Sequence, residues 1–214
     1  STTFAISNAY SDIASDLAET VLVINPELTS PHNDFTLRDS HFIFGDACVA
    51  SIIQKNATSK YKAKILDRKL VTQFSNNIRS DFSYLNRVEE NPRSEKDLFF
   101  KQNGKSVFKE VCPMVASLIT DQIDRNGLEV SDISQFWLHQ ANSNMCRFII
   151  TKILGTNDYD PKMCPMILSE FGNVASAGSM LSYHLNNYLE KGNKGIICSF
   201  GAGYSICSII IEKE

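Results

Sequence analysis

The sequence has 214 residues, of which 43% are hydrophobic and 21% charged, so it can bury a sizeable core as one large domain or two small ones. Its formal net charge of -3 gives no basic field that would attract nucleic acid or an anionic membrane, so neither is expected as a partner. No apolar run approaches the roughly 20 residues needed to cross a bilayer, and no membrane span is expected.

Six cysteines are spread along the chain, at positions 48, 112, 146, 164, 198 and 207. None forms a Cys-x-x-Cys pair, and none is spaced from a histidine as zinc ligands are, so no metal site is expected. Several lie in apolar runs, as Cys198 and Cys207 do. We therefore expect reduced, buried thiols in a cytoplasmic protein.

The first elements alternate between helical and strand patterns. Apolar residues at helical spacing over residues 4–18 predict a helix almost from the first residue, so we expect that the chain was cut or split from something upstream. Residues 21–24 form a continuous apolar run, which predicts a strand buried on both faces. A largely polar loop is expected over residues 25–39, followed by two short strands around a Gly-Asp turn or bulge within residues 42–53.

The middle of the chain contains a long polar stretch. A half-exposed strand is predicted over residues 62–71, and residues 72–104 are predicted to be a long loop with scattered aromatic residues. Helical spacing returns over residues 107–125, and the Asn-Gly pair that follows ends this helix. A strand over residues 136–138 then leads directly to His139.

The last third adds two helices and a hairpin. Asn142 or Ser143 can cap the helix after His139, and Gly155 ends it. Another helix is predicted over residues 176–189, and two strands joined by Gly-Ala-Gly are predicted over residues 195–211. Together these elements predict a layered α/β protein.

Two polar side chains are the candidate catalytic groups. His139 begins the stretch HQAN, and Asn173 lies in the stretch FGNVASA. Taken singly, a histidine after a strand is more often structural, and an asparagine after glycine is more often a turn residue. The combination of these stretches with a third, FGAGYS at residues 200–205, is far more specific.

In this order and at this spacing, the three stretches resemble the C-terminal half of the β-ketoacyl-[acyl-carrier-protein] synthase III family, in the thiolase-like superfamily. Residues 44–47, FGDA, resemble the family's FGDGA stretch, with Ala47 in place of a glycine. The resemblance covers the chain from Ser1 to Glu214. The most similar sub-group is the dialkylresorcinol-forming ketosynthases, because of FWLHQAN and CSFGAGYS.

The resemblance implies the layered αβαβα fold of thiolase-like enzymes. Residues 1–71 would form the end of the N-terminal half, residues 72–104 an inserted polar loop, and residues 105–214 the C-terminal half. The family usually dimerises through this fold, so a homodimer of the complete unit is expected.

The implied reaction is a decarboxylative Claisen condensation of an acyl thioester with a malonyl- or 3-oxoacyl-[acyl-carrier-protein], in fatty-acid or related lipid or polyketide biosynthesis. Neutral His139 and Asn173 would donate hydrogen bonds to the thioester oxygen on which charge builds as carbon dioxide leaves. The backbone N–H of Ala202, where the family usually has glycine, would serve a second oxyanion hole. Coenzyme A or carrier-protein thioesters would be substrates, and no cofactor is implied.

The family's nucleophilic cysteine lies just before the helix that opens this chain, and the opening stretch STTF does not contain it. Cys48 and Cys146 do not lie at a strand-to-helix elbow, where a helix N-terminus would stabilise a thiolate. We therefore expect acyltransferase activity only when an N-terminal, cysteine-bearing portion completes the enzyme from another chain or fragment.

Substrate and partner contacts also follow from the resemblance. Arg38, Phe200 and Gly201 would contact the substrate or coenzyme A. Arg38 matches the arginine that packs on the adenine of coenzyme A, although leucine replaces the aspartate before it. Acyl carrier protein is an expected partner, but the family's docking arginine is Asn144 here, and Arg147 is the candidate replacement.

Two other functions stay open on the sequence. The chain could be a non-catalytic, acyl-thioester-binding subunit of a heteromeric ketosynthase, which the presence of both His139 and Asn173 disfavours. It could also be a non-decarboxylating thiolase-like acyltransferase, but a histidine and a second cysteine would then be expected in the corresponding loops.

Overall fold

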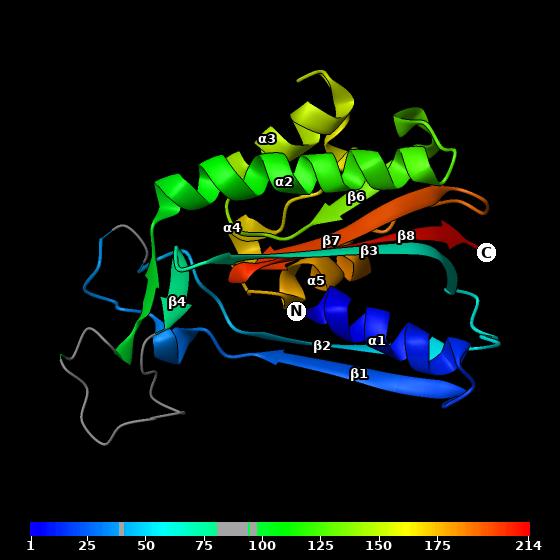
Figure 1. The fold of residues 1–214 in the computed structure, drawn as a ribbon, viewed down its shortest axis with the longest axis horizontal. Helices are drawn as coiled ribbons and strands as arrows, with labels where there is room; N and C mark the ends of the chain where they lie inside the picture. Colours follow the sequence, from blue (N-terminus) through cyan, green and yellow to red (C-terminus); the bar gives the residue numbers. More distant parts are fainter. Residues whose placement is uncertain (39–40, 81–93, 95–97) are drawn as a thin grey trace.

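The computed structural model describes residues 1–38, 41–80, 94 and 98–214, and these form alternating layers of helices and sheets (Figure 1). The outer helices α2 (Gly104–Arg125) and α3 (Ser143–Leu154) cover one face of the larger sheet. On its other face lie α1 (Thr2–Ala14) and α5 (Ala177–Leu185), followed by a smaller sheet. The observed α/β layering confirms the predicted fold class.

The larger sheet has four strands in the order β3-β8-β7-β6. Its strands are β3 (Ala63–Ser75), β6 (Ile133–Leu138), β7 (Lys194–Gly201) and β8 (Gly203–Lys213). The predicted hairpin is present, because β7 and β8 pair antiparallel, whereas β6 and β7 run parallel. Strands β6, β7 and β8 are buried over most of their length, as expected for a sheet covered on both faces, whereas β3 at the edge is half-buried to exposed.

The outer helices follow their sequence signals closely. The side chain of Asn142 accepts a hydrogen bond from the backbone N–H of Met145 at 3.0 Å, so it caps α3 as predicted. Gly155 ends α3 with a left-handed φ of 70°, which an L side chain rarely adopts. The apolar faces of α2 and α3 pack on β6, β7 and β8 to form the larger core.

The smaller sheet consists of β1 (Thr20–Glu27) and β2 (Ala47–Gln54), paired antiparallel. The prediction that residues 21–24 are buried on both faces is wrong for this chain. Val23 is buried, but Leu22 and Ile24 are 58% and 60% exposed. An antiparallel pair alternates its side chains between two faces, and in the described structure α1 and α5 lie on only one of them (Figure 1).

The polar stretch 72–104 is only partly a loop. Strand β3 continues to Ser75, and β4 (Ile78–Ser80) pairs with β5 (Phe100–Gln102). The rest of the predicted loop, residues 81–93 and 95–97, lies outside the described residues. Each of the two strands has only three residues, too few for an apolar pattern to stand out.

Helix α5 ends at Leu185, four residues earlier than predicted. The carbonyl oxygen of Asn186 accepts hydrogen bonds from Gln135 Nε2 and Trp137 Nε1, both at 3.1 Å. Because these hydrogen bonds to β6 hold Asn186 outside the helix, α5 ends at Leu185. Shorter elements connect the main ones: η1 (Ser30–His32), η3 (Val130–Asp132), η4 (Pro161–Met163) and α4 (Leu168–Phe171).

Among the helices that the structure describes, none combines the length and apolar character that a bilayer crossing requires.

Candidate active site

His139 lies directly after β6, at the carboxyl end of two parallel strands. Its backbone N–H donates to the carbonyl oxygen of Cys198 on β7 at 2.8 Å, which fixes the position of the residue. The side chain is 7% exposed, and its ring packs edge-on against Phe200, with centroids 4.7 Å apart. The carboxyl ends of parallel strands commonly carry functional side chains in α/β proteins, and His139 has this location.

Burial keeps the His139 imidazole uncharged. Desolvation lowers its pKa to about 4, and a hydrogen bond with the backbone of Ala175 opposes this shift only in part. The ring is therefore neutral at neutral pH. Its Nδ1 atom is buried and has no hydrogen-bond partner among the described residues. An unpartnered buried polar atom costs free energy, and such atoms in native structures often mark functional sites.

Asn173 lies in the turn after α4, and backbone hydrogen bonds hold it there. Its N–H donates to the carbonyl oxygen of Ile43 at 2.6 Å, and its carbonyl oxygen accepts from Gly45 N–H at 3.1 Å. The side-chain Oδ1 accepts from Ala175 N–H at 3.0 Å. This bond fixes the carbonyl end of the amide and leaves the NH₂ end without a partner within the described part of the chain.

The backbone of Ala175 connects the two candidate catalytic groups. It raises the pKa of the His139 ring, and its N–H donates to the Asn173 side chain. Ala175 has a φ of 47°, in the left-handed region that is uncommon for residues other than glycine. The structure thus places His139 beside Phe200, and Ala175 beside both His139 and Asn173. The catalytic roles of these residues stay predictions.

Gln140 joins the two loops that carry these groups. Its side chain is fully buried, and its Nε2 donates to the carbonyl oxygens of Leu138 at 2.9 Å and Pro165 at 3.4 Å. Its Oε1 accepts from Ile167 N–H at 3.1 Å, one residue before α4 and six before Asn173. Sequence reasoning did not single out this residue, although it stands inside the HQAN stretch.

The start of α1 lies against the Asn173 loop. Thr2 Oγ1 donates to the carbonyl oxygen of Ser176 at 2.8 Å, and Thr2 N–H donates to Ser176 Oγ at 3.2 Å. Ser176 in turn donates from its N–H and its hydroxyl to Glu27 Oε1, at 3.2 and 2.5 Å. Figure 1 shows the N-terminus beside α5, which begins just after Ser176. The first residues of the chain are therefore held at the candidate site.

The turn between β7 and β8 forms another side of the site. Phe200 is buried against His139, Gly201 is half-buried and Ala202 is exposed at the tip of the turn. Tyr204 is fully buried, and its hydroxyl accepts a hydrogen bond from Asn77 Nδ2 at 2.9 Å. Phe200, which is predicted to contact substrate, therefore lies beside His139.

The structure does not place the remaining predicted binding residues beside His139. Arg38 is exposed, and no interaction among the described residues connects it with His139 or Asn173. Asn144 and Arg147 are exposed on α3, one on its first turn and one on the next. Their predicted roles in coenzyme A binding and carrier-protein docking stay predictions.

The cysteines of the described residues are all free thiols, and all but Cys48 are buried. The thiol of Cys146 contacts His139, since its Sγ donates to the carbonyl oxygen of that residue at 3.4 Å. Burial raises the pKa of this thiol to about 12, so it stays protonated and is a poor nucleophile. Within the same residues, no three His, Cys, Asp or Glu side chains gather as metal ligands would.

Comparison with known families gives two adjacent matches. The model of the 3-oxoacyl-[acyl-carrier-protein (ACP)] synthase III C-terminal region matches residues 123–213. The model of 3-oxoacyl-[acyl-carrier-protein (ACP)] synthase III matches residues 1–73. The two matches leave out the polar stretch and most of α2.

Curated relatives carry names from the same family. A β-ketodecanoyl-[acyl-carrier-protein] synthase of Pseudomonas aeruginosa is 45% identical over 217 residues, which cover 100% of this chain and 62% of the relative. A β-ketoacyl-[acyl-carrier-protein] synthase III of Chlorobium phaeobacteroides is 28% identical over 219 residues, which cover 99% of this chain and 64% of the relative. The chain thus spans less than two thirds of the length of these relatives.

Solved structures show the same fold at low sequence identity. The 3-oxoacyl-[acyl-carrier-protein] synthase III of Aquifex aeolicus superposes with a TM-score of 0.81 at 18% identity, covering 99% of this chain and 63% of that one. The priming β-ketosynthase of the R1128 polyketide pathway gives a TM-score of 0.82 at 21% identity, with 99% and 62% covered. The predicted sub-group stays a prediction. Because the two family models, the relatives and the fold agree, the chain belongs to the 3-oxoacyl-[acyl-carrier-protein] synthase III family, with its thiolase-like α/β fold.

Proposed function

We propose that this chain is the part of a β-ketoacyl-[acyl-carrier-protein] synthase III-type acyltransferase that carries the histidine and asparagine. The complete enzyme would condense an acyl thioester with a malonyl- or 3-oxoacyl-[acyl-carrier-protein] in fatty-acid or related lipid biosynthesis. The observation that carries the proposal is the neutral, buried His139, whose pKa responds to the backbone of Ala175, the residue that also fixes the Asn173 side chain.

The chemistry needs hydrogen-bond donors that carry no charge of their own. When malonyl thioester loses carbon dioxide, the electrons of the broken C–C bond move onto the thioester oxygen as an enolate. The NH₂ group of Asn173 and the single N–H of neutral His139, in the tautomer that directs it at the substrate, would stabilise that charge more than they stabilise the uncharged carbonyl, and so lower the barrier. The enolate carbon then attacks the acyl-enzyme carbonyl, and the C–S bond to the nucleophile breaks.

The acyl group would be carried by a cysteine just upstream of α1. The bonds between Thr2 and Ser176 hold the start of α1 against the Asn173 loop, so residues that precede Ser1 would enter the site. The N-terminus of α1 would also stabilise a thiolate placed there. Ala202 would offer its backbone N–H to the oxygen of the acyl group.

The acyl substrate would be of medium length. The 45% identical relative is named for a ten-carbon β-ketoacyl product, and two of those carbons come from malonyl in a decarboxylative condensation. An eight-carbon acyl thioester is therefore the proposed primer. Acyl carrier protein would be the partner that presents the malonyl unit, Arg38 would bind coenzyme A, and the complete enzyme would work as a homodimer in the cytoplasm, where its free thiols would stay reduced.

The substitution His139→Ala in the complete enzyme tests this assignment. We expect the release of carbon dioxide from malonyl thioester to fall by on the order of 100- to 1000-fold, while acylation of the cysteine continues. Intact-mass measurement of the acyl-enzyme and release of labelled carbon dioxide separate the two steps. His184→Ala, on the exposed face of α5, is the matched control and should leave both steps unchanged. Equal loss of both steps in His139→Ala would contradict the assigned role.

A further inference from the structure

A small polar cluster joins three segments of the chain beside the candidate site. It consists of Thr2 at the start of α1, Asn25 and Glu27 at the end of β1, and Ser176 in the loop that carries Asn173. The hydrogen bonds within this cluster determine which of its groups donates and which accepts.

The carboxylate of Glu27 fixes the direction of the Ser176 hydroxyl. Glu27 Oε1 accepts from the Ser176 hydroxyl at 2.5 Å and from the Ser176 N–H at 3.2 Å, and Asn25 Nδ2 donates to the same oxygen at 3.3 Å. An ionised carboxylate can only accept, and a hydroxyl has one proton to give. The Ser176 proton therefore goes to Glu27, because the other acceptor, Asn25 Oδ1, is 3.3 Å away. The lone pairs of Ser176 Oγ are left for donors on α1.

Ser176 in turn caps the first turn of α1. The N-cap residue of this helix, Ser1, makes no side-chain capping hydrogen bond. Instead, Thr2 N–H donates to Ser176 Oγ at 3.2 Å, and Thr2 Oγ1 donates to the carbonyl oxygen of Ser176 at 2.8 Å. The cap thus comes from a loop 174 positions away, onto a fully buried residue. The negative charge of Glu27, one hydroxyl away, also interacts favourably with the positive end of the helix.

The same end of the smaller sheet holds the Asn173 loop at two points. Glu27 is the last residue of β1 and pairs with Ala47, the first residue of β2. Two residues before Ala47, Gly45 N–H donates to the carbonyl oxygen of Asn173 at 3.1 Å. The sheet therefore fixes one end of residues 173–176 through its backbone and the other end through the Glu27 carboxylate.

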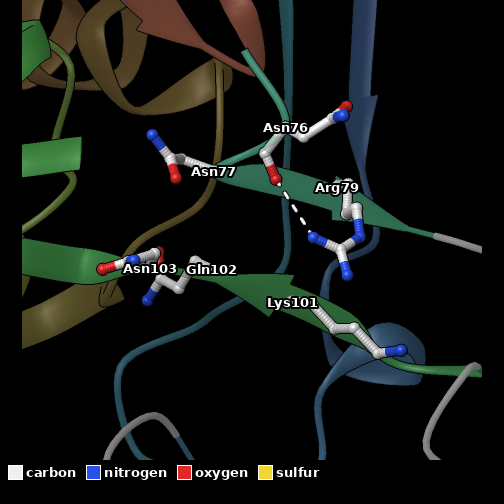
Figure 2. Close-up of a pocket in the computed structure, with 6 residues that line it drawn as sticks. All are labelled: Asn76, Asn77, Arg79, Lys101, Gln102 and Asn103. Carbon is white, nitrogen blue, oxygen red and sulfur yellow. Dashed lines mark hydrogen bonds between the residues drawn. The ribbon is translucent and has the colours of Figure 1, made fainter. Parts of the chain in front are cut away.

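Another long-range bond near the site holds a different element. Asn77, just before β4 (Figure 2), donates to the hydroxyl of Tyr204 at 2.9 Å, so it positions β8 and not α1. Among the residues that the structure describes, only Thr2 joins α1 to the Asn173 loop through side-chain hydrogen bonds. The relative position of α1 and this loop therefore depends on the cluster.

We propose that Glu27 is a positioning residue for the condensation. Through Ser176 it holds the start of α1, and with it the cysteine expected upstream, at a fixed place relative to Asn173. The proposal rests on the proposed function, because it requires an acyl-cysteine at that place.

The placement matters because the enolate left by decarboxylation has two fates. Its carbon can attack the acyl-cysteine carbonyl, which forms a C–C bond and breaks the C–S bond. It can instead take a proton from water and become an acetyl thioester. The first fate requires the reacting carbons to stand about 3–3.5 Å apart before reaction, so a displaced cysteine favours the second.

The test measures the ratio of the two products in the complete enzyme, which includes the residues upstream of Ser1. The substrates are saturating octanoyl-coenzyme A and malonyl carrier protein, and mass spectrometry quantifies 3-oxodecanoyl and acetyl carrier protein. Glu27→Ala should lower the ratio of 3-oxodecanoyl to acetyl product about tenfold. A variant that only folds less well would lose both products equally and keep the ratio. Glu27→Gln retains an acceptor oxygen for Ser176 and should keep the ratio within about twofold of the wild type.

Ser176→Ala removes the hydroxyl through which Glu27 acts, and it replaces Glu27→Ala as the test if that variant does not fold. It should lower the ratio by a similar factor. Glu27→Ala/Ser176→Ala should lower it no further, because both changes break the same series of hydrogen bonds. The matched control is Glu190→Ala, which removes an exposed carboxylate outside the cluster and should leave the ratio unchanged.

Three results would overturn the proposal. These are an unchanged ratio in Glu27→Ala, an equal loss in Glu27→Gln, and additive losses in the double variant. The second would assign the effect to the charge, and the third would exclude Ser176 as the connection. A wild-type enzyme that forms neither product would contradict the proposed function itself, whereas normal condensation with unchanged variant ratios would contradict only the role of Glu27.

Discussion

His139 combines nearly complete burial with a ring nitrogen that lacks a partner among the described residues. Burial disfavours the charged imidazole, which lowers its pKa from 6.5 to about 4. A site that stabilises a developing negative charge with neutral donors must keep this ring uncharged during turnover. The same property makes the folded state sensitive to acid.

Protonation of His139 should therefore reduce stability in a defined pH window. The unfolded chain takes up a proton at this residue near pH 6.5, and the folded state does so only near pH 4. Above about pH 6.5, His139 does not reduce the free energy of unfolding. As the pH falls from about 6.5 to about 4, the unfolded state gains a proton that the folded state does not, and the free energy of unfolding falls by at most about 3 kcal/mol. Urea unfolding at pH 7 and pH 4 should show a smaller loss in His139→Gln than in the wild type.

The exposed His184 provides the control for this measurement, since His184→Gln should lose stability with pH as the wild type does. An identical acid response in the wild type and in His139→Gln would contradict the assignment of a buried, neutral ring.

At the scale of elements, the site depends on how two loops are held together. Gln140 bonds the loop after β6 to the segment before α4 through three backbone groups. Leucine at this position keeps the size of the side chain but leaves those buried groups unpaired. We expect Gln140→Leu to lower the free energy of unfolding by about 2–4 kcal/mol, measured by urea titration.

Gln54 is exposed on β2 and makes one side-chain hydrogen bond, to Thr20 Oγ1. Gln54→Leu should therefore change stability by less than about 0.5 kcal/mol. A similar effect of both substitutions would argue against a structural role of Gln140 at the site.

Because residue 45 is glycine, the loop that carries Asn173 can pack directly against its backbone. A Cβ added at Gly45 would stand 2.1 Å from the carbonyl oxygen of Phe171, a contact that the backbone cannot relieve without moving. Gly45→Ala should displace the Asn173 loop, destabilise the protein by about 1–3 kcal/mol and reduce condensation more than cysteine acylation. Thermal unfolding and the two-step assay of the complete enzyme measure these effects.

Gly104 is the matched control for this substitution, since a Cβ there would meet no atom within 4 Å. Gly104→Ala should leave both stability and activity close to the wild-type values. Retention of activity in Gly45→Ala would show that the close approach is not needed for chemistry.

The local sequence predicted those elements whose ends carry a capping residue or a helix-ending glycine. The cap at Asn142 and the left-handed Gly155 delimit α3, so the position of His139 between β6 and α3 could be predicted. The β4–β5 pair and the early end of α5 could not, because they depend on contacts with distant residues. The hydrogen bonds from β6 to Asn186 are one example.

At the scale of the whole molecule, one apolar face stands out. Leu22 and Ile52 are cross-strand partners on the smaller sheet, and they are 58% and 66% exposed. Ile24 lies on the same face and is 60% exposed, opposite Ala50. A contiguous apolar face of this kind is typical of a surface that another chain or segment covers.

Residues 1–214 produced on their own should therefore self-associate. We expect sedimentation velocity to show concentration-dependent association, and Leu22→Lys/Ile52→Lys to raise the fraction of monomer, because two charges on that face oppose burial. A monodisperse monomer of the unsubstituted chain that unfolds cooperatively would contradict this prediction and the expectation of a completing portion.

The sequence did not predict which distant segments of the chain meet at the site. Thr2 and Ser176 are 174 positions apart, and no local pattern connects them. Family resemblance predicted that His139 and Asn173 would serve one site, but not that Ala175 would fix the Asn173 side chain and affect the pKa of His139. The placement of Arg79 opposite Lys101 likewise depends on a pairing that the sequence does not reveal.

Strand β8 lies between β3 and β7, although it is the last strand of the chain. A ribosome that has synthesised β3 must still add more than half of these residues before β8, one of the two inner strands of the sheet, is complete. Until then the edge of β3 that pairs with β8 stays unpaired, and the β7–β8 turn beside His139 has not formed. Assembly of this sheet must therefore wait until β8 has been synthesised, and a nascent chain that stalls before Gly203 should remain a substrate for chaperones.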